Sequence, residues 1–264
     1  MQYLAKGVRQ AGFATLVPHF KGYGFGERSD PFATGRWTEW RTQALEHFDE
    51  LARNYQSVCV SGLCVGAVLA LDLAAERPGQ VAALSLLATT LAYDGWSIPW
   101  YQFLAALAYY TPARYRYSYR ERYPYGVKNE SLRKWIAREM SEKTTSIAGA
   151  SSLPMTAVYE ARKLIRHVRG AISSVNAPAL VIHAKEDDVA SLKSAEFVLE
   201  NIGSKDVDFV LLHDSYHIVT LDNEKDVVAD ETIRFFRDRI RRTANASMGG
   251  EALRDAANKS TAAG

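Results

Sequence analysis

The chain has 264 residues, of which 47% are hydrophobic and 23% charged, a composition that is ordinary for a folded globular protein. Lys and Arg number 32 against 30 Asp and Glu, and the resulting net charge of +2 excludes the globally basic surface of a typical nucleic-acid-binding protein. No uncharged apolar stretch is long enough to span a bilayer. The two cysteines, Cys59 and Cys64, lie on one short segment, which predicts no disulfide framework and a cytoplasmic location.

The first elements alternate between helix and strand. Residues 2–11 predict an amphipathic helix that ends at Gly12, and residues 14–17 predict a short strand that ends at Pro18. A glycine-rich loop is expected at residues 21–29.

The most regular helix is predicted at residues 38–55, with Thr38 as its N-cap. One apolar stripe runs along it, formed by Trp40, Ala44, Phe48, Leu51 and Tyr55. A strand is expected at residues 57–60, followed by an apolar helix that ends near Glu76. The continuous apolar run at residues 81–88 is typical of a parallel strand that is buried on both faces.

The pattern changes in residues 93–169, which are rich in Tyr, Trp and Arg and lack a strand pattern. We expect a mostly helical segment inserted into the alternating part of the chain. The alternation then resumes, with strands at 179–183 and 207–212 and helices at 192–201 and 224–241.

Alternating strands and helices predict a mostly parallel α/β sheet with helices on both faces. We assign residues 1–92 and 170–242 to this core. Residues 93–169 are assigned to the inserted segment, and residues 243–264, which are small and polar, to a disordered tail.

The sequence Gly62-Leu63-Cys64-Val65-Gly66 joins a predicted strand to a predicted helix. It has the form of a nucleophile elbow, G-x-nucleophile-x-G, with Cys in the central position. A sharp turn there projects the side chain clear of the sheet, and both glycines are expected to allow close packing of strand and helix. The helix N-terminus lowers the pKa of a thiol, and the backbone N–H of Val65 is a candidate donor to an oxyanion.

Two later positions complete a candidate catalytic triad. Asp187 follows the strand at 179–183, and His217 follows the strand at 207–212, so both fall at the edge where α/β sheets place functional groups. In this arrangement His217 accepts the proton of Cys64, and Asp187 orients the imidazole. Asp188 is a rival acid, whereas Asp214 lies too close to His217 along the chain to reach around it.

Other interpretations of these residues stay open. Cys64 also fits a small apolar residue packed at a helix start, Asp187 a helix cap, and His217 an ordinary loop residue. A zinc site formed by His213, His217 and Asp187 is a further alternative. Dinucleotide binding is disfavoured because Cys64 occupies the place of the second glycine of G-x-G-x-x-G.

The chain resembles the carboxylesterase and monoacylglycerol-lipase branch of the α/β-hydrolases, which is also described as serine aminopeptidase-like. The matching residues cover nearly everything up to residue 241 and include Tyr3-Leu4-Ala5, Gly12-Phe13, Pro18, Gly22-Tyr23-Gly24, Trp37 to Trp40, the elbow, Asp187, Ser215-Tyr216-His217 and Thr220-Leu221-Asp222. The resemblance implies an α/β-hydrolase fold in which residues 93–169 form a lid over an acyl-binding cleft.

The chain departs from that family in two ways. Cys64 stands where the family has Ser, a change that keeps acyl transfer open and favours thioesters and activated esters over amides. The family also begins with three further strands and a loop that supplies a second oxyanion donor. We therefore expect an N-terminally truncated fold with a gap between strands 14–17 and 57–60, filled by upstream sequence or another chain, or closed by direct contact of these two strands.

The inserted segment carries candidate binding residues. Four aromatic side chains are expected to line the acyl pocket: Trp96, Trp100, Tyr101 and Phe103. Between residues 114 and 138, eight basic and two acidic residues alternate with tyrosines. The favoured interpretation is a solvated lid; weak contact with a membrane surface is second, and nucleic-acid binding is not expected.

The sequence therefore predicts a hydrolase of carboxylic esters or thioesters that acts through an acyl-enzyme on Cys64 and needs neither a metal nor an organic cofactor. Two alternatives remain. One is an impaired homologue that binds a lipid or a protein partner, and the other is an acyltransferase. The sequence does not fix an oligomeric state.

Overall fold

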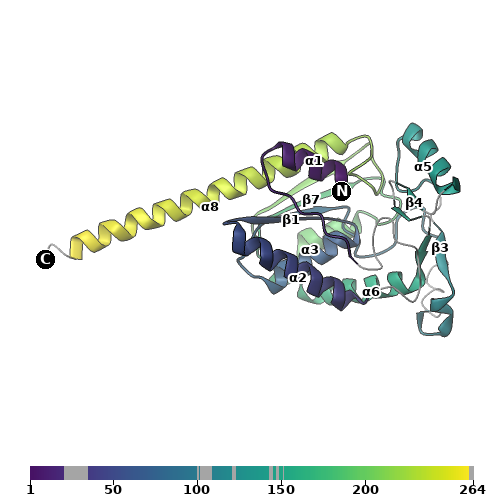
Figure 1. Ribbon diagram of the computed structural model, residues 1–264, viewed down its shortest axis with the longest axis horizontal. Coiled ribbons are helices and arrows are strands. Elements are labelled where there is room, and N and C mark those ends of the chain that lie inside the picture. Colours follow the sequence, from purple (N-terminus) through teal and green to yellow (C-terminus); the bar gives the residue numbers. More distant parts are fainter. Residues whose placement is uncertain are drawn as a thin grey trace.

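The computed structural model describes residues 1–20, 35–99, 101, 109–120, 123–142, 145–146, 149–150 and 152–261. Its centre is a four-stranded parallel sheet in the order β1-β2-β7-β8 (Figure 1). The strands are β1 (Val58–Leu63), β2 (Val81–Leu87), β7 (Ala179–Ala184) and β8 (Val207–Leu212). The expected α/β fold with a parallel sheet is confirmed.

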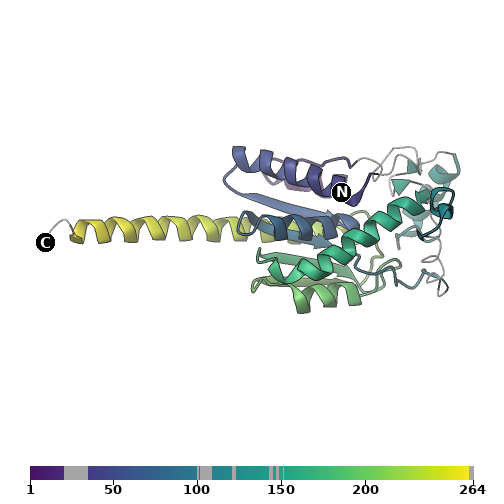
Figure 2. The same cartoon turned by 90° about the horizontal axis from the view of Figure 1, so that it is seen from below.

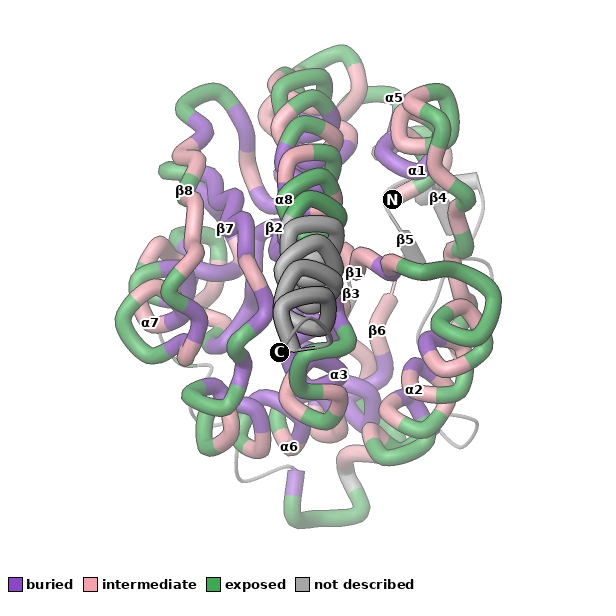
Figure 3. Tube along the Cα trace, turned by 90° about the vertical axis from the view of Figure 1, so that its left-hand side faces the viewer, coloured by how far each residue is buried: buried purple, intermediate pink, exposed green. Residues whose placement is uncertain are grey.

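The two central strands are built from apolar residues on both faces, as parallel strands between helical layers require. Every residue of β7 is buried, and in β2 only Ala82 is not fully buried. Strand β1 is mostly half-buried, which fits its place at the end of the sheet order (Figure 3). The sequence predicted β2, β7 and β8 to within one residue because each is a mostly apolar run, interrupted only by Ser85, His183 and Asp208, respectively.

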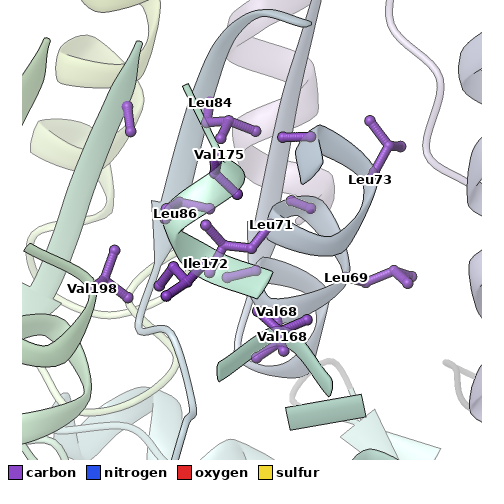
Figure 4. Close-up of a cluster of buried hydrophobic side chains, with 14 of the residues drawn as sticks. Val68, Leu69, Leu71, Leu73, Leu84, Leu86, Val168, Ile172, Val175 and Val198 are labelled. Carbon is purple, nitrogen blue, oxygen red and sulfur yellow. The ribbon is translucent and has the colours of Figure 1, made fainter. Parts of the chain in front are cut away.

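Four helices contribute to the core on one face of the sheet: α2 (Trp37–Asn54), α3 (Val65–Glu76), α6 (Met155–Ala171) and α7 (Lys193–Asn201). Helix α3 is apolar on nearly all sides because it packs against the sheet, α2 and α6; its buried Asp72 lies beside Arg41 and His167. Figure 4 shows Leu71 of α3 in the same cluster as Leu86 of β2 and Val168 of α6. The second half of α6 thus belongs to the core, although it falls within the predicted inserted segment.

The opposite face is covered by α1 (Gln2–Gln10) and α8 (Lys225–Thr261). Leu4 of α1 and Phe235 of α8 are buried against Leu87 and Ile182 of the sheet. Helix α1 ends at the predicted place, where Gly12 adopts a φ of +95°. Helix α8 continues to Thr261, whereas the sequence predicted an end near 241 and a tail beyond it (Figure 2). None of the described helices is both long and apolar enough to cross a membrane.

The predicted strand at 14–17 is wrong. Residues 13–19 carry no strand assignment, although burial alternates from Phe13 to Val17 as it does along a strand. An extended segment becomes a strand only when a neighbour supplies ladder hydrogen bonds. Among the described strands β1 pairs only with β2, so the two segments do not close directly against each other as a regular pair.

The N-cap prediction for α2 is also wrong. The helix begins at Trp37, one residue earlier than expected, and Arg36 occupies the N-cap position. The Glu39 carboxylate accepts a hydrogen bond from the Arg36 N–H at 3.3 Å, as in a capping box. This contact fixes the start of the helix without the Thr38 hydroxyl.

The inserted segment lies at the end of the molecule opposite the projecting end of α8 (Figures 1 and 2). It contains helix α5 (Glu130–Glu142) and a short 3-10 helix at Pro112–Tyr115. Contrary to the expectation of no strands, it also holds two small antiparallel pairs: β3 (Ser118–Arg120) with β6 (Ser152–Pro154), and β4 (Thr145–Ser146) with β5 (Gly149–Ala150). A 3-10 turn at Ile172–Ser174 then leads back to the sheet.

Candidate active site

Cys64 occupies the sharp turn between β1 and α3. Its backbone adopts φ 59° and ψ −123°, a conformation that costs a non-glycine residue about 1–3 kcal/mol. The Cys64 N–H donates to the Leu87 carbonyl of β2 at 3.0 Å, and its own carbonyl accepts from the Ala67 N–H at 3.1 Å. These contacts hold the strained turn in place and project the thiol from the end of the sheet.

The two glycines of the elbow have different roles. A Cβ on Gly62 would lie 2.2 Å from the Gly66 carbonyl oxygen and 2.5 Å from the Ala67 nitrogen, so only glycine lets the strand pass the helix at this point. A Cβ on Gly66 would meet no atom within 4 Å. The sequence therefore predicted the requirement at Gly62 correctly, whereas close packing does not require Gly66.

Asp187 lies in the loop after β7 with its carboxylate buried. Its Oδ1 accepts hydrogen bonds from the Val189 and Ala190 N–H groups, both at 2.8 Å. Burial by itself would raise the pKa of this carboxyl, but the charge and hydrogen bond of His217 outweigh burial and hold the pKa below its usual value. Asp187 thus caps its own loop and still presents a charged carboxylate to His217.

His217 follows β8 and brings its ring to Asp187. Nδ1 lies 2.8 Å from Oδ2 and 3.0 Å from Oδ1 of that carboxylate. Burial would lower the pKa of the imidazole, but the charges of Asp187 and Cys64 raise it well above 6.5. The opposite nitrogen, Nε2, is buried and has no hydrogen-bond partner of ordinary geometry in the described part of the chain.

The Cys64 thiol couples electrostatically to that imidazole. Burial would raise the pKa of the thiol, yet the positive charge of His217 and hydrogen bonds from the Thr90 hydroxyl and the Val65 N–H outweigh burial, and the pKa is lowered. Both cysteines are free, and burial raises the pKa of Cys59 to about 12. Cys64 is therefore the more readily ionised of the two thiols, and Cys59 has the character of an inert core thiol.

The rival acid, Asp188, does not contact the imidazole. Its Oδ1 accepts the backbone N–H of His217 at 3.2 Å, and its Oδ2 accepts the N–H of Gly126 at 3.2 Å. Burial raises its pKa. Asp188 therefore ties the histidine loop to the inserted segment, and the carboxylate at Nδ1 is that of Asp187.

Asp222 makes a second tie between the same two parts. Its carboxylate accepts the N–H groups of Lys128 at 2.7 Å, Asn129 at 2.9 Å and Tyr216 at 2.8 Å. The Ile218 N–H also donates to the Gly126 carbonyl at 2.8 Å. The turn at residues 126–129 is thus fixed to the loop that carries His217, a contact that the sequence did not predict.

The structure does not support the zinc alternative. Among the described residues, no three His, Cys, Asp or Glu side chains gather in a way that suits a metal ion. The Asp187 carboxylate is already engaged by His217 and by two backbone N–H groups of its own loop.

The sequence overlooked two buried side chains at this site. Nε2 of His183 lies 2.9 Å from the Ala190 carbonyl and 3.6 Å from Oδ2 of Asp187. The hydroxyl of Thr90 lies 3.2 Å from Sγ of Cys64. Thr90 closely follows β2, so the rule that pointed to Asp187 and His217, a polar residue just after a buried parallel strand, also pointed to it.

The predicted pocket residues divide into two groups. Trp100 and Phe103 lie outside the described residues, as does the glycine-rich loop. Trp96 is 57% exposed, donates from Nε1 to the Glu186 carbonyl at 2.9 Å and stands edge-on to Tyr216. Tyr101 is 49% exposed. A role of these side chains in acyl binding stays a prediction.

Comparison with known proteins identifies the family. A sequence profile of the serine aminopeptidase S33 family matches residues 1–226. The chain belongs to this family.

Two curated relatives are similar over most of their length. A thermostable monoacylglycerol lipase of Bacillus sp. (strain H-257) is 23% identical over 236 residues, 89% of this chain and 84% of the relative. A carboxylesterase of Bacillus subtilis (strain 168) is 22% identical over 241 residues, 89% of this chain and 85% of the relative.

Solved structures agree on the fold. One belongs to a study of LipS and LipT, two lipolytic enzymes derived from a metagenome, and matches with a TM-score of 0.73 and 22% identity over 90% of this chain and 87% of its own. A monoacylglycerol lipase of Paleococcus ferrophilus matches with a TM-score of 0.69 and 14% identity, over 89% of this chain and 88% of the lipase chain. These likenesses show the α/β-hydrolase fold.

Proposed function

We propose that the protein hydrolyses carboxylic esters or thioesters of a small acyl or lipid-like substrate through a covalent acyl-enzyme on Cys64. The observation that carries the proposal is the hydrogen bond of 2.8 Å between Asp187 and Nδ1 of His217, beside a thiol on a strained elbow. The lowered pKa of Cys64 and the raised pKa of His217 favour a thiolate–imidazolium pair.

In this mechanism the Cys64 thiolate attacks the carbonyl carbon of the substrate. The resulting oxyanion is stabilised by the backbone N–H of Val65, the first residue of α3. The imidazolium of His217 gives its proton to the departing alcohol or thiol as the bond to the carbonyl carbon breaks, leaving an acyl group on sulfur. Neutral His217 then takes a proton from water, the hydroxide attacks the thioester, and Cys64 leaves as a thiolate with the imidazolium restored.

Two considerations support esters and thioesters as the substrate class. Two of the similar proteins are a monoacylglycerol lipase and a carboxylesterase. A thiolate is also a better leaving group than an amine, so a tetrahedral adduct of an amide tends to expel Cys64 instead of completing acyl transfer. Although the family is named after an aminopeptidase, we therefore expect Cys64 to cleave peptide bonds less readily than esters or thioesters.

The test is mass spectrometry of the intact protein and its peptides after brief exposure to p-nitrophenyl acyl esters of different chain length. We expect one acyl group on Cys64 and release of p-nitrophenol. Cys64→Ala is expected to lose both signals, and Cys59→Ala, which removes the other thiol, is the matched control. Folded wild-type protein that gains no acyl group and releases no p-nitrophenol would overturn the proposal.

Added thiols or alcohols distinguish hydrolysis from transfer. If water is the acceptor, the free acid remains the main product when a competing acceptor is present. Formation of the new ester or thioester in its place would assign the protein to acyl transfer and contradict the hydrolase proposal. Equal lipid binding by wild type and Cys64→Ala, with no turnover in either, would favour a binding function.

We also propose weak contact of the inserted segment with a membrane surface. Tyr110 and Tyr123 are 71% and 67% exposed, and the guanidinium of Arg133 lies 4.6 Å from the ring of Tyr123. Exposed tyrosines beside arginines suit a lipid headgroup region. We expect the wild-type protein to sediment with anionic phosphatidylglycerol vesicles, and a smaller fraction of the Tyr110→Ser variant to do so. Absence of retention would contradict this proposal and leave the hydrolase proposal unaffected.

A further inference from the structure

The hydroxyl of Thr90 touches the sulfur that we assign as the nucleophile. Thr90 is fully buried and follows β2 by three residues. Its Oγ1 lies 3.2 Å from Sγ of Cys64 and also 3.2 Å from the carbonyl oxygen of Ala88. Ala88 has a φ of 42°, so the chain makes a tight turn that brings the hydroxyl back toward the elbow.

A threonine hydroxyl has one hydrogen and donates to one acceptor at a time. A neutral thiol is a weak acceptor, so the Ala88 carbonyl holds the hydrogen when Cys64 is protonated. A thiolate carries a full negative charge, and hydrogen bonds to charged acceptors are about twice as strong as neutral ones. The hydroxyl therefore turns to the sulfur when the sulfur is charged, and its contribution favours the thiolate over the thiol.

We propose that Thr90 stabilises the thiolate of Cys64 by donating its hydroxyl hydrogen to Sγ in the free enzyme, and that it returns this hydrogen to Ala88 when the sulfur is acylated. Its role in turnover rests on the proposed acyl-enzyme mechanism. The donation to Sγ is a property of the free protein and does not require that mechanism. No bond to carbon forms or breaks in this step, because only the hydrogen-bond acceptor changes.

The other groups that act on the thiol are known from the structure. The charge of His217 faces it from the loop after β8, with Asp187 behind the imidazole. The backbone N–H of Val65, at the start of α3, helps to lower the pKa of the thiol. Thr90 is the neutral hydroxyl in this set, so its removal leaves the charges at the site unchanged.

Four variants separate this role from a purely structural one. Thr90→Val keeps the shape and removes the hydroxyl, and Thr90→Ser keeps a hydroxyl. Thr89→Val is the matched control, because Thr89 is equally buried and its hydroxyl has no hydrogen-bond partner among the described groups. Thr90→Ala removes the same hydroxyl with a smaller side chain and serves if the valine variant does not fold.

The experiment is the rate of alkylation of Cys64 by iodoacetamide across a pH series, followed by peptide mass spectrometry. Alkylation reports the thiolate directly and needs no ester turnover. We expect the midpoint pH of Cys64 alkylation to rise by about one unit in Thr90→Val and Thr90→Ala. Thr90→Ser and Thr89→Val are expected to retain the wild-type midpoint.

A wild-type midpoint in both variants that lack the Thr90 hydroxyl would overturn the proposal, as would an equal shift in Thr89→Val. The outcome is separate from that of the proposed function. A shifted midpoint in a protein that hydrolyses no ester supports Thr90 and contradicts the hydrolase. Ester hydrolysis with an unshifted midpoint supports the hydrolase and contradicts the role of Thr90.

Discussion

The elbow offers a sharp test, because its two glycines are predicted to respond to alanine in opposite directions. In Gly62→Ala the new Cβ would lie 2.2 Å from the Gly66 carbonyl oxygen, where ordinary contact begins at 3.4 Å. The obstructing atoms are backbone and cannot rotate away, so we place the cost at the upper end of the range for overpacking, about 3 kcal/mol. Alanine also restricts the unfolded chain more than glycine does, which offsets up to about 1 kcal/mol of this cost. The net loss of unfolding free energy is therefore about 2 kcal/mol.

Gly66→Ala is the matched control. This glycine lies in the first turn of α3, its added Cβ meets nothing within 4 Å, and alanine favours a helix over glycine. We expect a gain in unfolding free energy of about 0.5–1 kcal/mol.

Urea unfolding followed by circular dichroism measures both changes. With a slope of about 3 kcal/mol per molar urea, the midpoint of Gly62→Ala falls by about 0.7 M and that of Gly66→Ala rises slightly. Equal destabilisation by the two substitutions would refute the reasoning from the contact at Gly62, and so would an unchanged midpoint in Gly62→Ala.

Three further predictions follow from the site. The pKa of Cys59 is about 12, so about one in 100,000 of its thiols is ionised at pH 7, whereas the lowered pKa of Cys64 puts its ionised fraction above the one in a hundred of an ordinary thiol. Because a lowered pKa preserves the thiolate as the pH falls, iodoacetamide should prefer Cys64 by at least about a thousandfold. Peptide mass spectrometry after brief treatment measures this preference. Asp187→Asn removes the charge that raises the pKa of His217, so the imidazole should lose its proton at lower pH and acyl transfer should fall at least about a hundredfold; an unchanged pH–rate profile would contradict this. Asp222→Asn replaces one of the carboxylate oxygens that accept backbone N–H groups with an NH₂ donor, which should loosen the turn at residues 126–129. Trypsin should then cleave after Lys128 about tenfold faster than in wild type. Equal cleavage rates would show that this carboxylate does not hold the turn.

The parts of the site that the sequence predicted depend on local pattern and on one rule of topology. The turn at Cys64 is encoded by neighbouring glycines between an apolar strand and an apolar helix. Asp187 and His217 were predicted because parallel strands end at the same edge of a sheet, so residues 30 apart in sequence meet there. The same rule applied to β2 indicates Thr90, which lies three residues beyond the end of that strand.

The features that the sequence did not predict depend on distant contacts. Residues 14–17 have the composition of a strand, but pairing depends on a neighbour that local composition does not reveal. The ties from Asp188 and Asp222 join segments that lie 62 and 94 residues apart along the chain. A carboxylate that accepts backbone N–H groups leaves no periodic signal, so its partners become visible only in the fold.

The position of Cys64 allows the effect of Gly62→Ala on alkylation of the thiol to be distinguished from its effect on the free energy of unfolding. Strand β1 ends the described sheet. The elbow is held from two sides, by Leu87 at the end of β2 and Thr90 beyond it, and by the Ala67 N–H of α3, which donates to the Cys64 carbonyl. A loss of about 2 kcal/mol leaves a domain with an unfolding free energy of about 5–15 kcal/mol almost entirely folded. Any fall in the alkylation rate of Cys64 in Gly62→Ala therefore reports a displaced thiol and not a larger unfolded fraction. A wild-type alkylation rate beside the lowered urea midpoint would show that the elbow yields elsewhere and that contact with α3 does not position the sulfur.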